Sequence, residues 1–288
     1  MLLSPLAFVY ALGVGVKRKR ALKRLWKPAV PVISVGNLIL GGSGKTPLTK
    51  AIFNEFGAEM RVFIVLRGYK RQSKGLVLVC EDGEIKCDVK TSGDEAMEYA
   101  TTLPGANVIV AENRRDGINE AIRRGARLVI LDDGFGKFDI FKFEILLRPS
   151  REPALNLTIP SGAYRYPKSF YALADFIPGE GDVIKTSHID GEREKMALVT
   201  GIANPWRLKE YFARCATCAF FPDHYNFSRE ELAAVLANSG ADSLLVTQKD
   251  YVKISKFELP ISVIVLDTKI GEKFRAKIAE FIQNYNQI

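Results

Sequence analysis

The stretch "VPVISVGNLILGGSGKTPLTK", residues 30–50, is the strongest indication of the fold in this sequence. An apolar run with the character of a buried strand enters a glycine-rich turn, and a segment with helical spacing follows at 47–57. Backbone N–H groups gather in such a turn and point toward the start of the helix, where they bind phosphate. The stretch therefore predicts a nucleotide-binding parallel-sheet domain.

Each position of the turn has an expected role. Lys45 would reach the β- and γ-phosphates of ATP, and the Thr46 hydroxyl would hold Mg²⁺. The full phosphate-loop consensus has glycine at position 39, where this chain has Ile39, so the match is a variant form. A glycine turn without a ligand is the alternative. The residues predicted to cradle the nucleotide are Gly41, Gly42, Ser43, Gly44, Lys45 and Thr46.

A nucleotide site also needs a carboxylate for the metal ion, and "RLVILDDG" supplies Asp132 and Asp133 after an apolar run. Ligands of open α/β sheets bind at the carboxyl ends of strands, which is where both aspartates fall. Because neighbouring residues of an extended chain point to opposite sides, we expect one of the two to face the metal. A solvated turn is the alternative.

The rest of the chain repeats the alternation of short apolar runs and amphipathic segments that is typical of an α/β fold. One series, with helices expected at 47–57, 93–101 and 115–124, predicts a phosphate-loop domain over 31–150 with an inserted hairpin at 75–90. A second series predicts a smaller α/β domain over 183–288, with helices at 205–213, 228–238 and 271–284. The segment 151–182 is rich in Pro and Gly and is interpreted as the connection.

Positive charge is concentrated at the N-terminus. The net charge is +8, yet residues 1–30 contain seven Lys and Arg and no acid; without them 34 basic residues stand against 33 acidic ones. The sixteen uncharged residues before this cluster are short for a span of about 20 residues, so we expect segment 1–30 to lie on a membrane surface. A buried first helix with a solvated basic end is the alternative, and a nucleic-acid partner is not expected.

Four scattered cysteines exclude a disulfide framework. Cys215 and Cys218 form a C-x-x-C, but Cys80 and Cys87 are separated by six intervening residues, longer than the usual zinc spacing. Reduced thiols are expected, with a four-thiolate zinc site as the alternative.

Phosphoryl transfer further needs a group that positions the acceptor oxygen. Asp94 and Glu95 begin a predicted helix, where spacing alone favours a helix cap. His224 lies in the dense polar and aromatic turn "FFPDHYNFS".

Seven stretches in order, "SVGNLILGGSGKTP", "LRGY", "GDEAM", "LDDGF", "GIANP", "FPDHYNFS" and "TQKDYVK", resemble the tetraacyldisaccharide 4′-kinases. The resemblance runs to about residue 254. It implies two α/β domains with an N-terminal membrane-associated helix on the cytoplasmic face of the bacterial inner membrane. It also implies transfer of the γ-phosphoryl of ATP to the 4′-hydroxyl of the lipid A disaccharide precursor. No obligate protein partner is inferred.

The same resemblance implies site residues. Asp94 would act on the sugar hydroxyl with His224 orienting it, and Lys45 would stabilise the transferred charge. Thr46, Asp132 and Asp133 would serve Mg²⁺. Asn37, Glu95 and Arg114 would contact substrate, with Arg115 as the competing alignment to Arg114. The family's D-D-G-x-Q-H has Gly136 and Lys137 at its end here, and its Arg-Glu-Pro is Arg165-Tyr166-Pro167.

An alternative function is a membrane-recruited ATPase switch, which also uses a variant glycine loop but phosphorylates no acceptor. Such a switch would not require Asp94 and His224.

Overall fold

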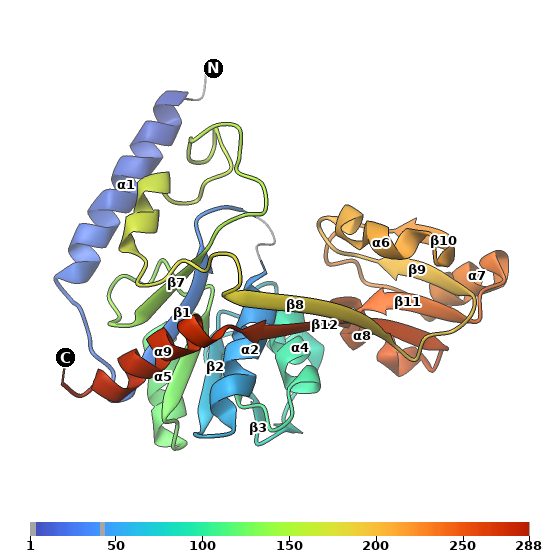
Figure 1. Cartoon of the computed structure of the whole chain (residues 1–288), viewed down its shortest axis with the longest axis horizontal. Helices are drawn as coiled ribbons and strands as arrows, with labels where there is room; N and C mark the ends of the chain where they lie inside the picture. The colour runs from blue at the N-terminus through green and yellow to red at the C-terminus, as the bar shows by residue number, and fades with distance from the viewer. Residues whose placement is uncertain (1–3, 41–43, 288) are drawn as a thin grey trace.

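The computed structural model describes residues 4–40 and 44–287. Two sheets of different size form its framework, and a long two-stranded ribbon runs between them (Figure 1). The prediction of two mainly parallel sheets covered by helices is confirmed.

The larger sheet has the strand order β4-β3-β5-β2-β6-β1-β7. Its centre is parallel and fully buried, as the continuous apolar runs predict. Its strands are β1 (Val32–Asn37), β2 (Val62–Leu66), β3 (Val77–Glu81), β4 (Glu84–Ile85), β5 (Val108–Val110), β6 (Leu128–Asp132) and β7 (Phe143–Leu147). The predicted hairpin is β3 and β4, and it adds two antiparallel strands to the edge of this sheet.

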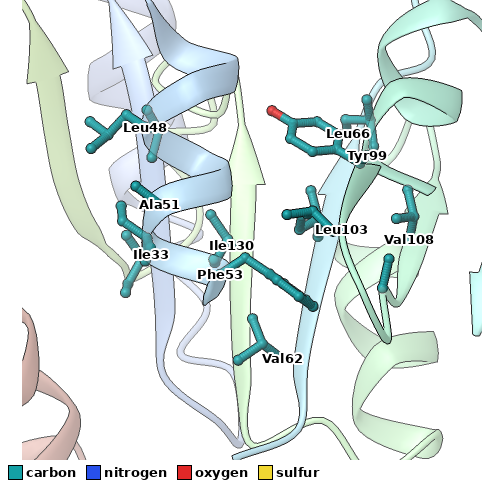
Figure 2. Close-up of a cluster of buried hydrophobic side chains, with 14 of the residues drawn as sticks. Ile33, Leu48, Ala51, Phe53, Val62, Leu66, Tyr99, Leu103, Val108 and Ile130 are labelled. Atoms are coloured by element: carbon teal, nitrogen blue, oxygen red, sulfur yellow. The ribbon is translucent and has the colours of Figure 1, made fainter. Parts of the chain in front are cut away.

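Helices cover both faces of the larger sheet. Helix α2 packs its apolar face on β1, β2 and β6, where Leu48, Ala51 and Phe53 meet Ile33, Val62 and Ile130 (Figure 2). The helices of this part are α2 (Lys45–Gly57), α3 (Val89–Ser92), α4 (Asp94–Thr102) and α5 (Arg114–Arg123). The predicted positions of α2, α4 and α5 are confirmed to within two residues.

The smaller sheet has the order β10-β9-β11-β12-β8. Its strands are β8 (Val183–Asp190), β9 (Met196–Thr200), β10 (Cys215–Phe220), β11 (Ser243–Thr247) and β12 (Ile261–Ile270). Its helical segments are η2 (Pro205–Leu208), α6 (Lys209–Phe212), α7 (Arg229–Ser239), α8 (Gln248–Ile254) and η3 (Ser255–Phe257). Strand β8 pairs antiparallel with β12 along the whole of β8, and the two strands form the ribbon.

The chain ends on the larger sheet and not on the smaller one. The chain returns along β12 to helix α9 (Glu272–Asn284). Phe274 and Ile278 of this helix are buried in the core that α2 also covers. Phe274 stacks on Phe176 with ring centroids 4.4 Å apart. The predicted second domain, 183–288, therefore differs from the structure in its last helix.

The predicted connection, 151–182, also differs from a loose linker. It contains the short helix η1 (Lys168–Leu173), and Tyr164 and Tyr171 are buried with Leu38 and Phe135 at the carboxyl end of β1. This segment is held against the larger sheet because its aromatic side chains find an apolar surface there.

Helix α1 (Ser4–Leu22) lies on that segment and shows a large apolar surface. Ala7 is buried and its carbonyl accepts a hydrogen bond from Thr158. Phe8, Val9 and Leu12 are 69%, 66% and 71% exposed, so the alternative of a buried first helix does not fit. Within the described residues, no helix is long and apolar enough to cross a membrane.

The four cysteines are free and lie apart. Cys80 is on β3 of the larger sheet, and Cys215 and Cys218 are on the edge strand β10 of the smaller one. Nowhere in 4–40 or 44–287 do three or more His, Cys, Asp or Glu side chains gather in a metal-binding group. A four-thiolate zinc site is therefore not formed by this arrangement.

Candidate active site

The carboxyl end of β1 and the start of α2 form the floor of the site. Gly44 precedes α2 with φ 85°, a left-handed conformation that glycine adopts without strain, and Lys45 is the first helical residue. Gly41, Gly42 and Ser43 lie outside the described residues. Because β1 pairs in parallel with β6, Val35 stands beside Asp132. The register thus brings the predicted phosphate loop and the predicted metal carboxylates to one edge.

Asp132 and Asp133 have different surroundings. Tyr99 of α4 donates a hydrogen bond of 2.8 Å to Asp132 Oδ2, whereas the buried Asp132 Oδ1 has no hydrogen-bond partner in the described part of the chain. Burial raises the pKa of Asp132, although Lys45 and Tyr99 oppose the rise. An orphaned, buried carboxylate oxygen at this edge fits a hard cation such as Mg²⁺.

Asp133 is neutralised by an arginine that sequence reasoning did not assign. Arg165 donates to Asp133 Oδ1 and Oδ2 at 2.8 and 3.0 Å, and it also donates to Asn37 Oδ1 at 2.7 Å. Lys45 Nζ lies 3.8 Å from Asp133 Oδ1. Burial would raise the pKa of Asp133, but Arg165 and Lys45 outweigh it and hold this pKa below its usual range. The stretch "AYRYP" contains Arg165, but the sequence gives no sign that this arginine pairs with Asp133, 32 positions away.

Glu95 faces the same group of charges. Burial and the charge of Asp132 raise its pKa to about 7, while Lys45 and Lys249 act in the opposite direction. Two neighbouring carboxyl groups with raised pKa values, one buried and one half-buried, favour a bound cation, since a positive ion would compensate for the charge that burial penalises.

Arg114 and Arg115 are separated by the structure. Arg114 is buried at the start of α5 and donates to the carbonyls of Ala111 at 2.7 Å and Asp132 at 3.5 Å. Arg115 instead pairs with Asp139 at 2.9 Å and holds the carbonyl of Arg24. Of the two alignments, Arg114 is the one beside the aspartates.

Further positive charge lies near Arg114. Burial and then the charges of Arg114, Lys17 and Arg67 lower the pKa of Lys137. These four side chains come from α1, from the loops after β2 and β6, and from α5. We refer to Lys17, Arg67, Arg114 and Lys137 as the basic cluster.

Asp94 and His224 meet across the two parts of the chain. Asp94 is the first residue of α4, and Gly93, with φ 85°, is the N-cap. The Asp94 carboxylate contacts His224 instead of capping its own helix: Asp94 Oδ2 lies 2.9 Å from His224 Nδ1. These residues are 130 positions apart, so the contact requires both sheets in their observed arrangement.

His224 is held in an unusual backbone conformation. Its φ is 62°, which costs a non-glycine residue on the order of 1 kcal/mol or more. Its N–H donates to the Gly201 carbonyl at 3.1 Å, and its ring lies edge-on to Tyr69 with centroids 6.1 Å apart. Such strain at a polar turn is typical of functional sites.

Two lysines of α8 complete this region, and neither was predicted as a site residue. Lys253 Nζ lies 3.1 Å from Asp94 Oδ2, and Lys249 Nζ lies 3.1 Å from Asp223 Oδ1 and 3.5 Å from His224 Nε2. "TQKDYVK" contained both residues, but a helical lysine is usually solvated, so the sequence carried no signal for their inward direction.

Comparison with known proteins agrees over nearly the whole chain. The family model described as LpxK, tetraacyldisaccharide-1-P 4′-kinase, matches residues 1–193 and 180–285. A tetraacyldisaccharide 4′-kinase of Campylobacter jejuni is 46% identical over 99% of this chain and 91% of its own length. One of Helicobacter pylori is 40% identical over 98% and 89%.

A solved structure has the same fold. LpxK from Aquifex aeolicus, crystallised in complex with ATP, superposes with a TM-score of 0.81 at 27% identity, covering 98% of this chain and 100% of that one. The chain therefore belongs to the tetraacyldisaccharide 4′-kinase family.

Proposed function

We propose that the protein transfers the γ-phosphoryl group of ATP to the 4′-hydroxyl of a tetraacylated disaccharide 1-phosphate, a step of lipid A biosynthesis. The observation that carries the proposal is the 2.9 Å contact between Asp94 and His224. The next residue, Glu95, faces Lys45 and the two aspartates. Such a pair would serve to deprotonate an acceptor hydroxyl, and the nature of that acceptor, sugar or water, distinguishes the kinase from the ATPase switch.

Asp94 would take the proton of the attacking hydroxyl as the bond to phosphorus forms. His224 would orient this carboxylate through its contact with Asp94 Oδ2. Lys45 and the N–H groups at the start of α2 would bind the phosphates and stabilise the charge that develops on them. No covalent intermediate on the protein is proposed. The acceptor hydroxyl would attack the γ-phosphorus directly, in line with the leaving oxygen of ADP.

Thr46 and Asp132 would hold Mg²⁺, with Asp133 close to the ion through its pairing with Lys45 and Arg165. The orphaned Asp132 Oδ1 is the support for this assignment. When bound, the ion would neutralise charge on the phosphate oxygens.

For the acceptor, we assign Arg114 and the basic cluster to an anionic part of the substrate. The relatives' family description names a 1-phosphate, and the charges of Arg114, Lys17 and Arg67 all act on Lys137. Lys137 supplies a positive charge at the position where the family pattern D-D-G-x-Q-H has histidine. Asn37 and Glu95 would contact substrate from the carboxyl ends of β1 and the start of α4.

We also assign α1 to the surface of the inner membrane, on its cytoplasmic face. An apolar surface of Phe8, Val9 and Leu12 beside a run of Lys and Arg suits an anionic leaflet. A lipid acceptor whose acyl chains stay in the bilayer requires an enzyme at that surface.

The test is direct. The purified protein is incubated with ATP–Mg²⁺ and a tetraacyldisaccharide 1-phosphate, and a bisphosphate product is sought by mass spectrometry. Lys45→Ala should lower turnover well beyond tenfold, because no other side chain replaces a charge on the β- and γ-phosphates; tenfold is only about 1.4 kcal/mol in barrier. ATP hydrolysis without a bisphosphate would favour the ATPase switch instead.

A further inference from the structure

Lys253 is a buried lysine at the end of α8 whose charge has not been given a role. Only 9% of the residue is exposed, although lysine is rarely buried without a partner. Burying an ammonium group is costly unless ionic and hydrogen-bonding partners compensate it. Its partners should therefore reveal what it does.

The ammonium group of Lys253 joins two parts of the proposed catalytic pair. It lies 3.1 Å from Asp94 Oδ2 and donates to the carbonyl of Tyr225, also at 3.1 Å. Asp94 belongs to α4, on the larger sheet, and Tyr225 directly follows His224 in the loop after β10. One cation thus contacts the base and the backbone that carries its partner.

Both contacts to the carboxylate converge on one oxygen. His224 Nδ1 lies 2.9 Å and Lys253 Nζ 3.1 Å from Asp94 Oδ2, the carboxylate oxygen to which both side chains make their closest contact. A carboxylate held at one oxygen from two directions cannot rotate freely, so the direction of its second oxygen is fixed.

The base of α8 is itself anchored. Asp250 is buried and accepts hydrogen bonds from Thr200 at 2.7 Å, Thr247 at 2.9 Å and the Gly201 amide at 3.2 Å. Gly201 also accepts the N–H of His224. The helix that presents Lys253 is therefore tied to the same loop that supports His224.

We propose that Lys253 is a positioning residue for the phosphoryl transfer: its ammonium group fixes Asp94 Oδ2 and the Tyr225 carbonyl together and leaves Asp94 Oδ1 for the acceptor hydroxyl. The inference rests on the proposed function, in which Asp94 is the base. It adds an electrostatic consequence, since a cation at this distance keeps the carboxylate ionised.

The pKa of Asp94 agrees with that consequence. Burial would raise it, but the hydrogen bond from His224 and the charge and hydrogen bond of Lys253 outweigh burial, and the pKa of Asp94 lies below its usual range. The charged or titratable groups around Asp94 are Glu95 of α4, Tyr69 and Arg71 of the loop after β2, Asp223 and His224 of the loop after β10, and Lys249 and Lys253 of α8.

The experiment compares Lys253→Met, Lys253→Gln and Lys253→Arg in the full-length protein. Kinase turnover, KM for ATP, the pH dependence of kcat/KM and thermal stability are measured with the disaccharide 1-phosphate acceptor. Glutamine keeps a donor for Tyr225 without the charge, so it remains informative if the methionine variant does not fold. Lys256→Met, an exposed lysine of the neighbouring turn, is the matched loss of one charge.

We expect kcat to fall about 10²-fold for Met and Gln, the scale of a misplaced reacting group, with KM for ATP nearly unchanged. Removing the cation raises the pKa of Asp94. Because the ionised carboxylate is the active form, the acid limb of the profile should move to higher pH. Arginine should recover part of the rate, and Lys256→Met should behave as wild type.

Two results would overturn the inference while leaving the kinase intact: wild-type kcat and pH profile in Lys253→Gln, or a rate loss that follows stability with no shift of the acid limb. Asp94→Ala, measured alongside, separates the failures. An active Asp94→Ala would remove the base itself and with it this part of the proposed function.

Discussion

Asp132 and Asp133 are adjacent in the sequence, yet their carboxylates lie in different surroundings. Asp132 ends β6 and points into the protein beneath Tyr99, whereas Asp133 turns outward with φ 51° and meets Arg165. Alternation along an extended chain predicts that the two separate, and the structure confirms this separation. The identity of each partner could not be predicted, because Tyr99 and Arg165 come from other parts of the chain.

The same limit applies to Asp94. From spacing alone, an acidic residue at the start of a helix is a cap; its contact with His224 depends on two sheets being placed side by side. Family resemblance linked the two residues. It covered Lys253 through "TQKDYVK" but gave this lysine no role, because its pairing needs atomic positions.

A double-mutant cycle with Asp94→Ala and His224→Ala tests whether the pair acts as a unit. Each single variant should lose on the order of 10²–10⁴ in kcat, the usual range for general acid–base catalysis, and the double variant should be little worse. His188→Ala is the control: this exposed histidine pairs with Asp267 on the ribbon and should leave the rate unchanged. Additive losses, or losses explained by a lower free energy of unfolding, would contradict a shared catalytic role.

At the scale of elements, apolar runs predicted the buried strands well because strands covered on both faces must be apolar throughout. Strand β8 was missed for the opposite reason. Most of "VIKTSHID" is exposed and polar, and it is a strand because β12 provides hydrogen-bond partners along its length. The local pattern of apolar residues does not indicate which distant strand a segment will pair with.

Helix α1 shows a comparable limit, since its apolar sequence allowed either a buried helix or a surface helix. The described structure leaves Phe8 and Leu12 largely exposed on one side, four residues apart. What covers that side is the question that a binding experiment answers.

Phe8→Gln combined with Leu12→Gln should weaken binding to anionic vesicles at least tenfold. Burying two large apolar side chains contributes roughly 3 kcal/mol or more, and about 1.4 kcal/mol corresponds to a tenfold change. Vesicle flotation measures the bound fraction, and added salt should lower it for the unmodified protein.

The matched control is Leu76→Gln with Ile85→Gln, which changes two exposed apolar residues at the far edge of the larger sheet. This variant should float like the unmodified protein. Equal flotation of the α1 variant and this control would mean that α1 does not hold the protein at a membrane.

For the whole molecule, the notable feature is that the chain crosses between the sheets twice. It leaves the larger sheet along β8, builds the smaller sheet, and returns along β12 to α9 (Figure 1). The amphipathic pattern of 271–284 correctly predicted a helix with one apolar face. It could not indicate which of two apolar surfaces that face would cover, since both are equally suitable by hydrophobicity alone.

This return means that the last helix stabilises the part of the chain that contains the larger sheet. Phe274 is fully buried against Phe176, and Arg275 pairs with Glu55 and Glu59 of the α2 region. Deleting a buried phenylalanine side chain leaves a cavity and typically costs about 3–5 kcal/mol. Phe274→Ala should therefore lower the free energy of unfolding of the larger sheet by about that amount.

Denaturant unfolding followed in the presence and absence of ATP locates the effect. The transition that ATP stabilises belongs to the part containing Lys45, and we expect Phe274→Ala to lower the midpoint of this transition. Phe220→Ala is the control, because Phe220 is a half-exposed phenylalanine on β10 and should change that midpoint far less. If Phe274→Ala instead weakened only a transition that ATP does not stabilise, α9 would contribute to the stability of the smaller sheet. The packing of α9 on the larger sheet would then not support the proposed active site.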